Sequence, residues 1–355
     1  MRNIFAWRLS LGLLLALALK DVEAQISRAS TSASYVERGN AWMKKGEIER
    51  AIADYNLAIS IDSRYANAYY NRGVAKQHKG DLAGALSDFN RAIELNPRNT
   101  DAYLNRGVVH DELGAREAAI NDFSRVIEIN PRNARAWSNR GKARIDQGAS
   151  VAALADLNQA IKLDSRNADA WSNRCFARWR QGAVDEALAD CDRALRLDAR
   201  LAAAWNNRGL ARQEKGDLDG ALADHDRAIT LDPQPAAFYS NRARAWLLKE
   251  EPEQALSDLN RALALNPNLA EAWEHRGVVW FARQDFTQAI TDFNKALELN
   301  PRLADAHCSR GVTWLAQGKL KEAEADFNRC RALGGMPQPA AERLLQEMRR
   351  RLKVK

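Results

Sequence analysis

The chain repeats itself every 34 residues. An arginine recurs at this interval nine times and is followed by glycine in seven of them, at Arg38, Arg72, Arg106, Arg140, Arg174, Arg208, Arg242, Arg276 and Arg310. An aspartate follows each arginine by 16 residues, from Asp54 to Asp326. A fixed period of this length predicts an array of similar units in which each unit packs on its neighbours in sequence.

Each unit has the pattern of two helices. In the second unit, apolar and small residues fall at helical spacing in two blocks, one from Tyr69 to Ala75 and one from Leu82 to Leu95. Gly80-Asp81 between the blocks is typical of a helix end followed by an N-cap, and Asn96-Pro97 stops the second helix. The spacing therefore predicts an all-α fold with nine helix-turn-helix units over residues 32–337.

These units resemble the tetratricopeptide repeat family. Gly73 matches the family's small eighth position, Ala85 the twentieth and Ala92 the twenty-seventh. Large aromatics stand at the fourth and twenty-fourth positions, as Trp137, Trp171, Trp205, Trp273, Phe89, Phe123, Phe293 and Phe327. The resemblance implies a right-handed α-solenoid, the handedness being the family's. One departure is systematic, because the seventh position, commonly Leu, is Arg in all nine units.

The segments that flank the repeats have different expected roles. Residues 1–24 read as a signal peptide with a basic flank, an apolar stretch over 9–19 and a small-residue cleavage site before Gln25, and residues 25–31 as a linker. An uncleaved anchor is the alternative, but the apolar stretch is shorter than the roughly 20 residues that span a bilayer. We expect an exported mature chain without a membrane span, in a bacterial periplasm, with the endoplasmic reticulum lumen or secretion as alternatives.

Residues 338–355 are expected to form a helix that caps the last unit and a basic tail. Leu344, Leu345, Met348 and Leu352 would make its apolar stripe.

The arginine and aspartate rows are interpreted as structural. In the family's geometry the seventh position points toward the twenty-third, so that a planar guanidinium would face a carboxylate. The predicted pairs include Arg72 with Asp88, Arg106 with Asp122, and Arg140 with Asp156.

A row of amides precedes the arginines by one residue. In the family this sixth position faces the concave surface, where an amide can pair with the backbone of an extended peptide. The candidate partner-binding amides are Asn71, Asn105, Asn139, Asn173, Asn207 and Asn241. The alternative is that they are merely solvated.

Aromatic and apolar residues fall at other concave positions. Phe176 and Trp179 form a pair midway along the chain, and the later repeats place Leu247, Val278, Phe281 and Leu315 on the same face. An exposed apolar groove is typical of a partner site. Packing against the terminal helix, or against a second copy in a homodimer, is the alternative.

The four cysteines fall two to a unit. Cys175 and Cys191 occupy the eighth and twenty-fourth positions, which face each other in the family, so a disulfide in an oxidising compartment competes with two buried thiols. A bond between Cys308 and Cys330 is less favoured.

The chain shows no pattern typical of an enzyme. We find no metal-binding cluster, glycine-rich phosphate loop or nucleophile elbow, so we expect no catalysis, no metal and no cofactor. The net charge of +7 is interleaved with acidic residues along most of the chain, which argues against nucleic acid. The sequence predicts a scaffold that binds a peptide or a partner protein along its concave surface. The alternative is an accessory protein for glycan or polymer secretion or wall synthesis.

Overall fold

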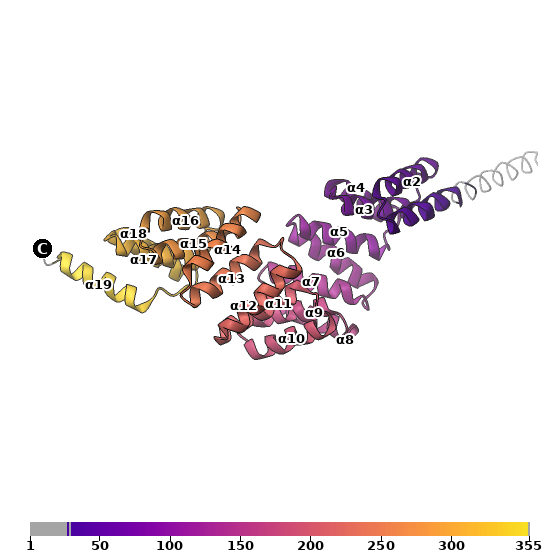
Figure 1. Cartoon of the computed structure of the whole chain (residues 1–355). Coiled ribbons are helices and arrows are strands. Elements are labelled where there is room, and N and C mark those ends of the chain that lie inside the picture. Colours follow the sequence, from indigo (N-terminus) through magenta and orange to yellow (C-terminus); the bar gives the residue numbers. More distant parts are fainter. Residues whose placement is uncertain (1–26, 28–29, 354–355) are drawn as a thin grey trace, which may run out of the picture. The chain divides into compact units, whose positions relative to one another are not determined.

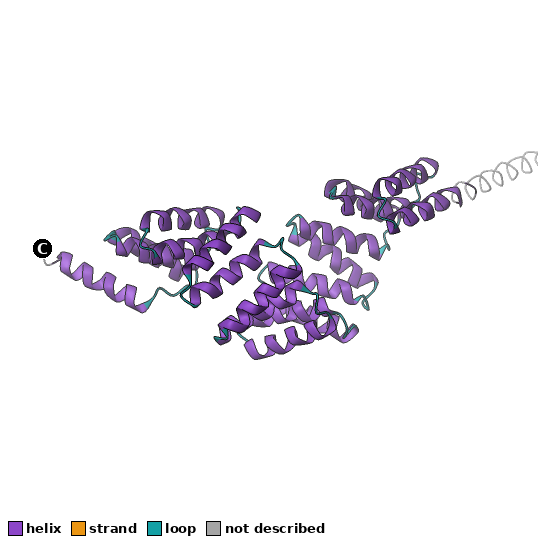
Figure 2. Ribbon diagram, viewed as in Figure 1, coloured by secondary structure: helices purple, strands orange, loops and turns teal. Residues whose placement is uncertain are grey.

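Helices make up almost all of the structure, a computed structural model that describes residues 27 and 30–353 (Figures 1 and 2). No strand occurs among these residues, so the all-α prediction is confirmed. The predicted signal peptide lies outside them. None of the described helices is both long and apolar enough to cross a lipid bilayer.

The chain divides into two compact units at Ser165 and Arg166. The first contains a helix over residues 30–44, followed by α2 (Ile48–Ile61), α3 (Ala66–Lys79), α4 (Leu82–Leu95), α5 (Thr100–Glu112), α6 (Arg116–Ile129), α7 (Ala134–Asp146) and α8 (Ser150–Leu163). The second contains α9 (Ala168–Trp179), α10 (Val184–Leu197), α11 (Ala202–Lys215), α12 (Leu218–Leu231), α13 (Ala236–Leu248), α14 (Pro252–Leu265), α15 (Ala270–Ala282), α16 (Phe286–Leu299), α17 (Ala304–Ala316), α18 (Leu320–Ala332) and α19 (Pro339–Lys353).

Within each unit the helices pack as successive hairpins. The two helices of a repeat contact each other, as α3 does α4, and the second helix also contacts the first helix of the next repeat, as α4 does α5. First helices of neighbouring repeats touch as well, in the series α3, α5 and α7 and in the series α9, α11, α13, α15 and α17. We call the surface that these first helices line the first-helix face.

Local sequence explains where the helices begin and end. Asp81 accepts a hydrogen bond from the Gly84 amide at 2.9 Å and so caps the start of α4. Gly80 before it has φ 85°, a left-handed conformation that glycine adopts without steric cost. The turns of repeats seven and eight place Glu250 and Gln284 in the same conformation.

Close approach at the eighth position sets the distance between the helices of a hairpin. A Cβ on Gly73 would lie 2.7 Å from Cε1 of Phe89, and a Cβ on Gly277 would lie 2.6 Å from Cε1 of Phe293. These aromatic rings are fully buried. The glycine is therefore needed because the ring fills the space that a side chain would occupy.

Helix α19 caps the last repeat. Ala341 and Leu345 are buried against Phe327 and Leu315, with Met348 partly buried beside them. The predicted apolar stripe is wrong for Leu344, which is 47% exposed, because the packed face centres on Ala341 and Leu345. The side chain of Leu352 lies outside the described residues.

Candidate functional site

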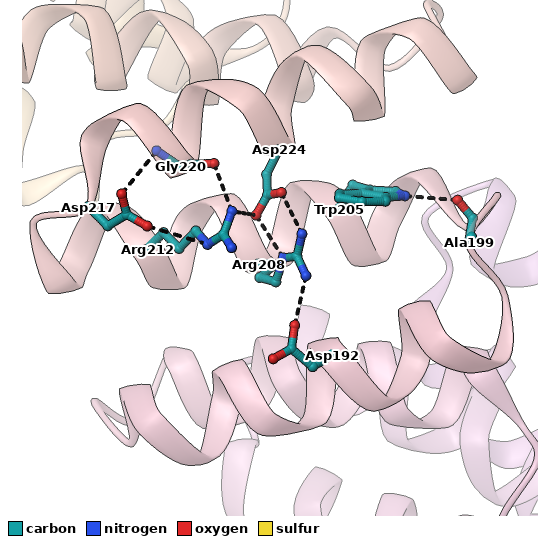
Figure 3. A network of polar contacts seen from close by, with 8 residues as sticks. All are labelled: Asp192, Ala199, Trp205, Arg208, Arg212, Asp217, Gly220 and Asp224. Atoms are coloured by element: carbon teal, nitrogen blue, oxygen red, sulfur yellow. Dashed lines mark hydrogen bonds and ion pairs between the residues drawn. The ribbon is translucent and has the colours of Figure 1, made fainter.

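The arginine of the seventh position joins two repeats. Figure 3 shows Arg208, whose Nε and Nη2 each donate to the Asp224 carboxylate at 2.8 Å. Its third nitrogen, Nη1, donates at 2.7 Å to Asp192 of the preceding repeat. The guanidinium carbon also lies 4.7 Å from the centre of the Trp205 ring. We call this arrangement the arginine clasp.

The predicted pairs form the same clasp. The distances between guanidinium nitrogen and carboxylate oxygen are 2.6 Å for Arg72 and Asp88, 2.5 Å for Arg106 and Asp122, and 2.8 Å for Arg140 and Asp156. The three aspartates are at most 5% exposed. A buried carboxylate needs such a partner, which explains why both residues recur together.

Two further partners of the clasp were missed by sequence reasoning. The twenty-fifth position of the preceding repeat accepts from Nη1, as Asn56 does from Arg72 at 2.6 Å and Ser124 from Arg140 at 3.0 Å. The eleventh position supplies a second donor to the aspartate, as Arg144 does to Asp156 at 2.6 Å. In repeat eight this donor is an indole, Trp280.

The amide row connects neighbouring first helices. Asn105 donates to the Tyr70 hydroxyl at 3.0 Å and Asn241 to Asn206 Oδ1 at 2.9 Å, each time across to the fifth position of the preceding repeat. The same contact continues where the residue type changes, since His275 Nδ1 lies 3.2 Å from Ser240 Oγ. Much of the row is therefore an inter-repeat ladder.

One of the predicted ligand-binding amides is wrong because it is buried in this ladder, while others are half-buried. Asn207 is only 9% exposed, and its amide nitrogen donates to the Ser172 carbonyl and hydroxyl, both at 3.2 Å, so it is not available to a peptide. Asn71 donates to the Asn67 carbonyl of its own helix at 2.8 Å. Asn139 and Asn173 lie half-buried on the first-helix face of their repeats.

The apolar candidates divide into one buried residue and several accessible ones. Leu315 is wrong as a partner-binding residue, because α19 covers it and leaves it 3% exposed. Leu247, Val278 and Phe281 are half-buried, and Leu248 next to them is 52% exposed. The Phe281 ring packs 5.6 Å from that of Phe286.

The aromatic pair of repeat five is also half-buried. The rings of Phe176 and Trp179 lie 5.4 Å apart, and Trp179 packs on the core around Cys175 and Cys191.

Polar groups adjoin the apolar residues on α13 and α15. Glu274 is 7% exposed, with Ser309 Oγ 3.4 Å from its carboxyl and His275 Nε2 also 3.4 Å away. Burial raises the pKa of Glu274 to about 8, and the nearby charge of Asp305 adds to the effect. Arg244 lies close enough to act on both Glu274 and His275, yet forms no hydrogen bond or ion pair among the described residues.

Both cysteine pairs are disulfides. Cys175 and Cys191 join the helices of repeat five with a Cα separation of 5.4 Å, where other repeats place glycine against an aromatic ring. Cys308 and Cys330, the pair that the sequence favoured less, are bonded at the same Cα separation. The fifth and twenty-seventh positions that they occupy lie close enough because α17 and α18 pack along their length.

A buried histidine replaces the core aromatic in repeat six. His225 is fully buried over Gly209, and neither ring nitrogen has a hydrogen-bond partner among the described residues. Burial lowers the pKa of His225 to about 3. Unpaired buried polar atoms destabilise a fold, so His225 contributes less to stability than the phenylalanine at this position in other repeats.

Replacing His225 with Phe is expected to raise the free energy of unfolding by about 1–3 kcal/mol at neutral pH, because two unpaired nitrogens are removed. Folding lowers the pKa of His225 from 6.5 to about 3, so the unfolded chain takes up a proton that the folded chain does not. The free energy of unfolding therefore decreases as the pH falls through this window. The loss is roughly 2 kcal/mol at pH 5. Urea unfolding at both pH values measures the effect, with exposed His78→Gln as the control. Equal acid sensitivity of His225→Phe and the unmodified chain would contradict it.

Sequence comparison matches the repeats to known family models. A model described as TPR repeat matches residues 39–80 and 112–148, and one described as tetratricopeptide repeat matches residues 242–308. Two others described as tetratricopeptide repeat match residues 66–99 with 202–235 and residues 139–202 with 281–337. Together these matches span most of the nine repeats.

The chain belongs to the tetratricopeptide repeat family.

Solved structures agree with this tetratricopeptide repeat fold. One is a tetratricopeptide repeat protein from Parabacteroides merdae, 20% identical, with a TM-score of 0.59 over 70% of this chain and 99% of that chain. Another is a chain of the APC/C hetero-tetramer Cut9–Hcn1, 15% identical, with a TM-score of 0.66 over 89% of this chain and 76% of that one. At these identities the likeness shows the fold alone. No curated protein sequence matches the chain.

The described residues of this repeat protein contain no group of three or more His, Cys, Asp or Glu side chains placed to hold a metal ion.

Proposed function

We propose that this tetratricopeptide repeat protein is a non-catalytic scaffold that binds an extended segment of a partner protein on the first-helix face of α13 and α15. The observation that carries the proposal is a surface that is apolar at one end and polar at the other. Asn241, Arg244 and Leu248 follow one another along one side of α13, at helical spacings of three and four residues.

The neighbouring helix α15 also runs from a polar residue to apolar ones along one side. Glu274, Val278 and Phe281 follow one another along α15, and α13 and α15 are in contact. Side chains of the partner would pack on Leu248, Val278 and Phe281, while Arg244 and the side-chain oxygen Oδ1 of Asn241 would bond its polar groups. Asn241 Nδ2 already donates one hydrogen bond to Asn206, so its side-chain oxygen and its second N–H remain for a ligand.

We also propose that the protein works outside the cytoplasm. Its two disulfides support this, because such bonds persist in oxidising compartments and are rare in the cytosol. The apolar segment over residues 9–19 fits an export signal.

Photo-crosslinking tests the peptide-binding proposal. A benzoylphenylalanine at Leu248 is expected to form an adduct with a protein partner in the native extract. The same probe at Val151, which is 81% exposed on the second helix of repeat four, serves as the control. Once the partner is identified, Phe281→Ser is expected to weaken its binding by about tenfold, as loss of an aromatic anchor does. Adducts of equal yield at both positions, or retention on polysaccharide alone, would count against the proposal.

A further inference from the structure

Almost all of the net charge lies at the C-terminal end. Residues 329–355 contain eight Lys and Arg residues against two acids, while the whole chain has a net charge of +7. The repeats before them are therefore nearly neutral overall. A charge asymmetry of this size creates a local positive potential that the scaffold function does not require.

Three of the described cations at this end are unpaired, unlike those of the arginine clasp. Arg329 on α18 and Arg343 and Arg350 on α19 are exposed and form no hydrogen bond or ion pair among the described residues. One of the two acids, Glu342, is already neutralised by Arg331, a pair that holds the end of α18 beside the start of α19. The net positive charge is thus left to attract an anionic partner.

Exposed apolar side chains occur in the same segment as these cations. Met336, in the loop before α19, is 91% exposed, and Leu344 on α19 is 47% exposed. Leu344 lies at the edge of the face that packs on α17 and α18 through Ala341 and Leu345. Both residues are therefore accessible, and Leu344 follows Arg343 directly in sequence, while the rest of the helix's apolar side is used by the cap.

We propose that this end, made of Met336 and α19 with Arg329, binds the surface of an anionic phospholipid bilayer. Cations next to large apolar side chains suit an interface where headgroups carry phosphate and acyl chains lie just below. Nucleic acid or an acidic protein surface would use the cations but gain little from Met336 and Leu344. The surface is distinct from Leu248 and Phe281, so the proposal stands or falls apart from peptide binding.

Vesicle flotation tests the proposal. The chain is expressed from Gln25, so that the apolar stretch over residues 9–19 cannot contribute. It is expected to float with equimolar phosphatidylcholine and phosphatidylglycerol vesicles at low salt, and not with phosphatidylcholine alone. The combined variant Arg329→Gln, Arg343→Gln, Arg350→Gln should reduce the bound fraction more than tenfold, since each cation near an anionic surface strengthens binding by about fivefold.

Two matched variants make the test decisive. Arg98→Gln, Arg132→Gln, Arg302→Gln removes the same charge from exposed loops between repeats and should float like the unmodified chain. Met336→Ser with Leu344→Ser keeps every cation and should weaken binding at least severalfold. If the loop variant loses binding equally, overall charge is responsible and the assignment is wrong. If the serine variant binds normally, the end recognises polyanions by charge alone and the bilayer is not its partner. Absence of flotation for the unmodified chain also overturns it.

Discussion

Replacing Arg140 with Ala is expected to lower the free energy of unfolding by about 3 kcal/mol, toward the lower end of the range for a broken buried ion pair. Arg140 donates twice to Asp156, which is 2% exposed, and once to Ser124 of the preceding repeat. Its guanidinium carbon also lies 4.8 Å from the centre of the Trp137 ring. The effect is kept from being larger by Arg144, which still bonds the Asp156 carboxylate.

Denaturant unfolding followed by circular dichroism measures this loss. Arg125→Ala is the matched control, because Arg125 pairs with Glu128 on the surface, where the two side chains are 46% and 63% exposed. An exposed pair contributes at most about 1 kcal/mol, so this variant should unfold close to the unmodified chain. Equal unfolding midpoints for the two variants would show that the arginine clasp does not hold the repeats together.

Breaking the disulfide between Cys175 and Cys191 is expected to lower the stability of the second unit by about 3 kcal/mol. The two residues are 16 apart in sequence, and closing a loop of this size removes a corresponding amount of entropy from the unfolded chain. The double substitution Cys175→Ala, Cys191→Ala also loses the packing of two fully buried sulfur atoms. Thermal unfolding of this variant, with and without reductant, measures the effect.

A repaired variant separates the covalent bond from the packing. Cys175→Gly with Cys191→Phe introduces the pair found in four other repeats, such as Gly73 with Phe89. It should recover part of the lost stability and leave only the bond between Cys308 and Cys330 sensitive to reductant. Free thiols at Cys175 and Cys191, found by alkylation of the unreduced chain and mass measurement, would contradict this account.

The sequence predicted contacts that recur with the same residue types. A fixed separation of 16 between Arg140 and Asp156, repeated in every unit, can be satisfied only by a contact that every unit makes. The acceptor at the twenty-fifth position escaped notice because Asn56, Ser124 and Asp192 share a hydrogen-bonding role and no common chemistry. A search for shared acceptor capacity, in place of shared residue type, could have found it.

The candidate binding residues were harder to assign. Periodicity placed Leu315 correctly on the first-helix face, but whether that face is open depends on where α19 docks, and α19 lies outside the repeat pattern. The role of Asn207 depends on Ser172 in the preceding repeat, so its burial is a property of two neighbouring repeats together. Exposure at an array's end and across its junctions is set by tertiary packing.

Within each compact unit, the arginine clasp runs in the same direction at every junction between repeats. Its donor belongs to the later repeat and its acceptor to the earlier one, as for Arg242 and Asp226 or Arg276 and Asn260. Removal of the 34 residues from Ala202 to Pro235 would present Asp192 to Arg242 in place of Asp226, an equivalent carboxylate. Whole repeats are therefore interchangeable parts, and gene duplication or deletion in steps of one repeat can change the length of the protein without requiring a new interface.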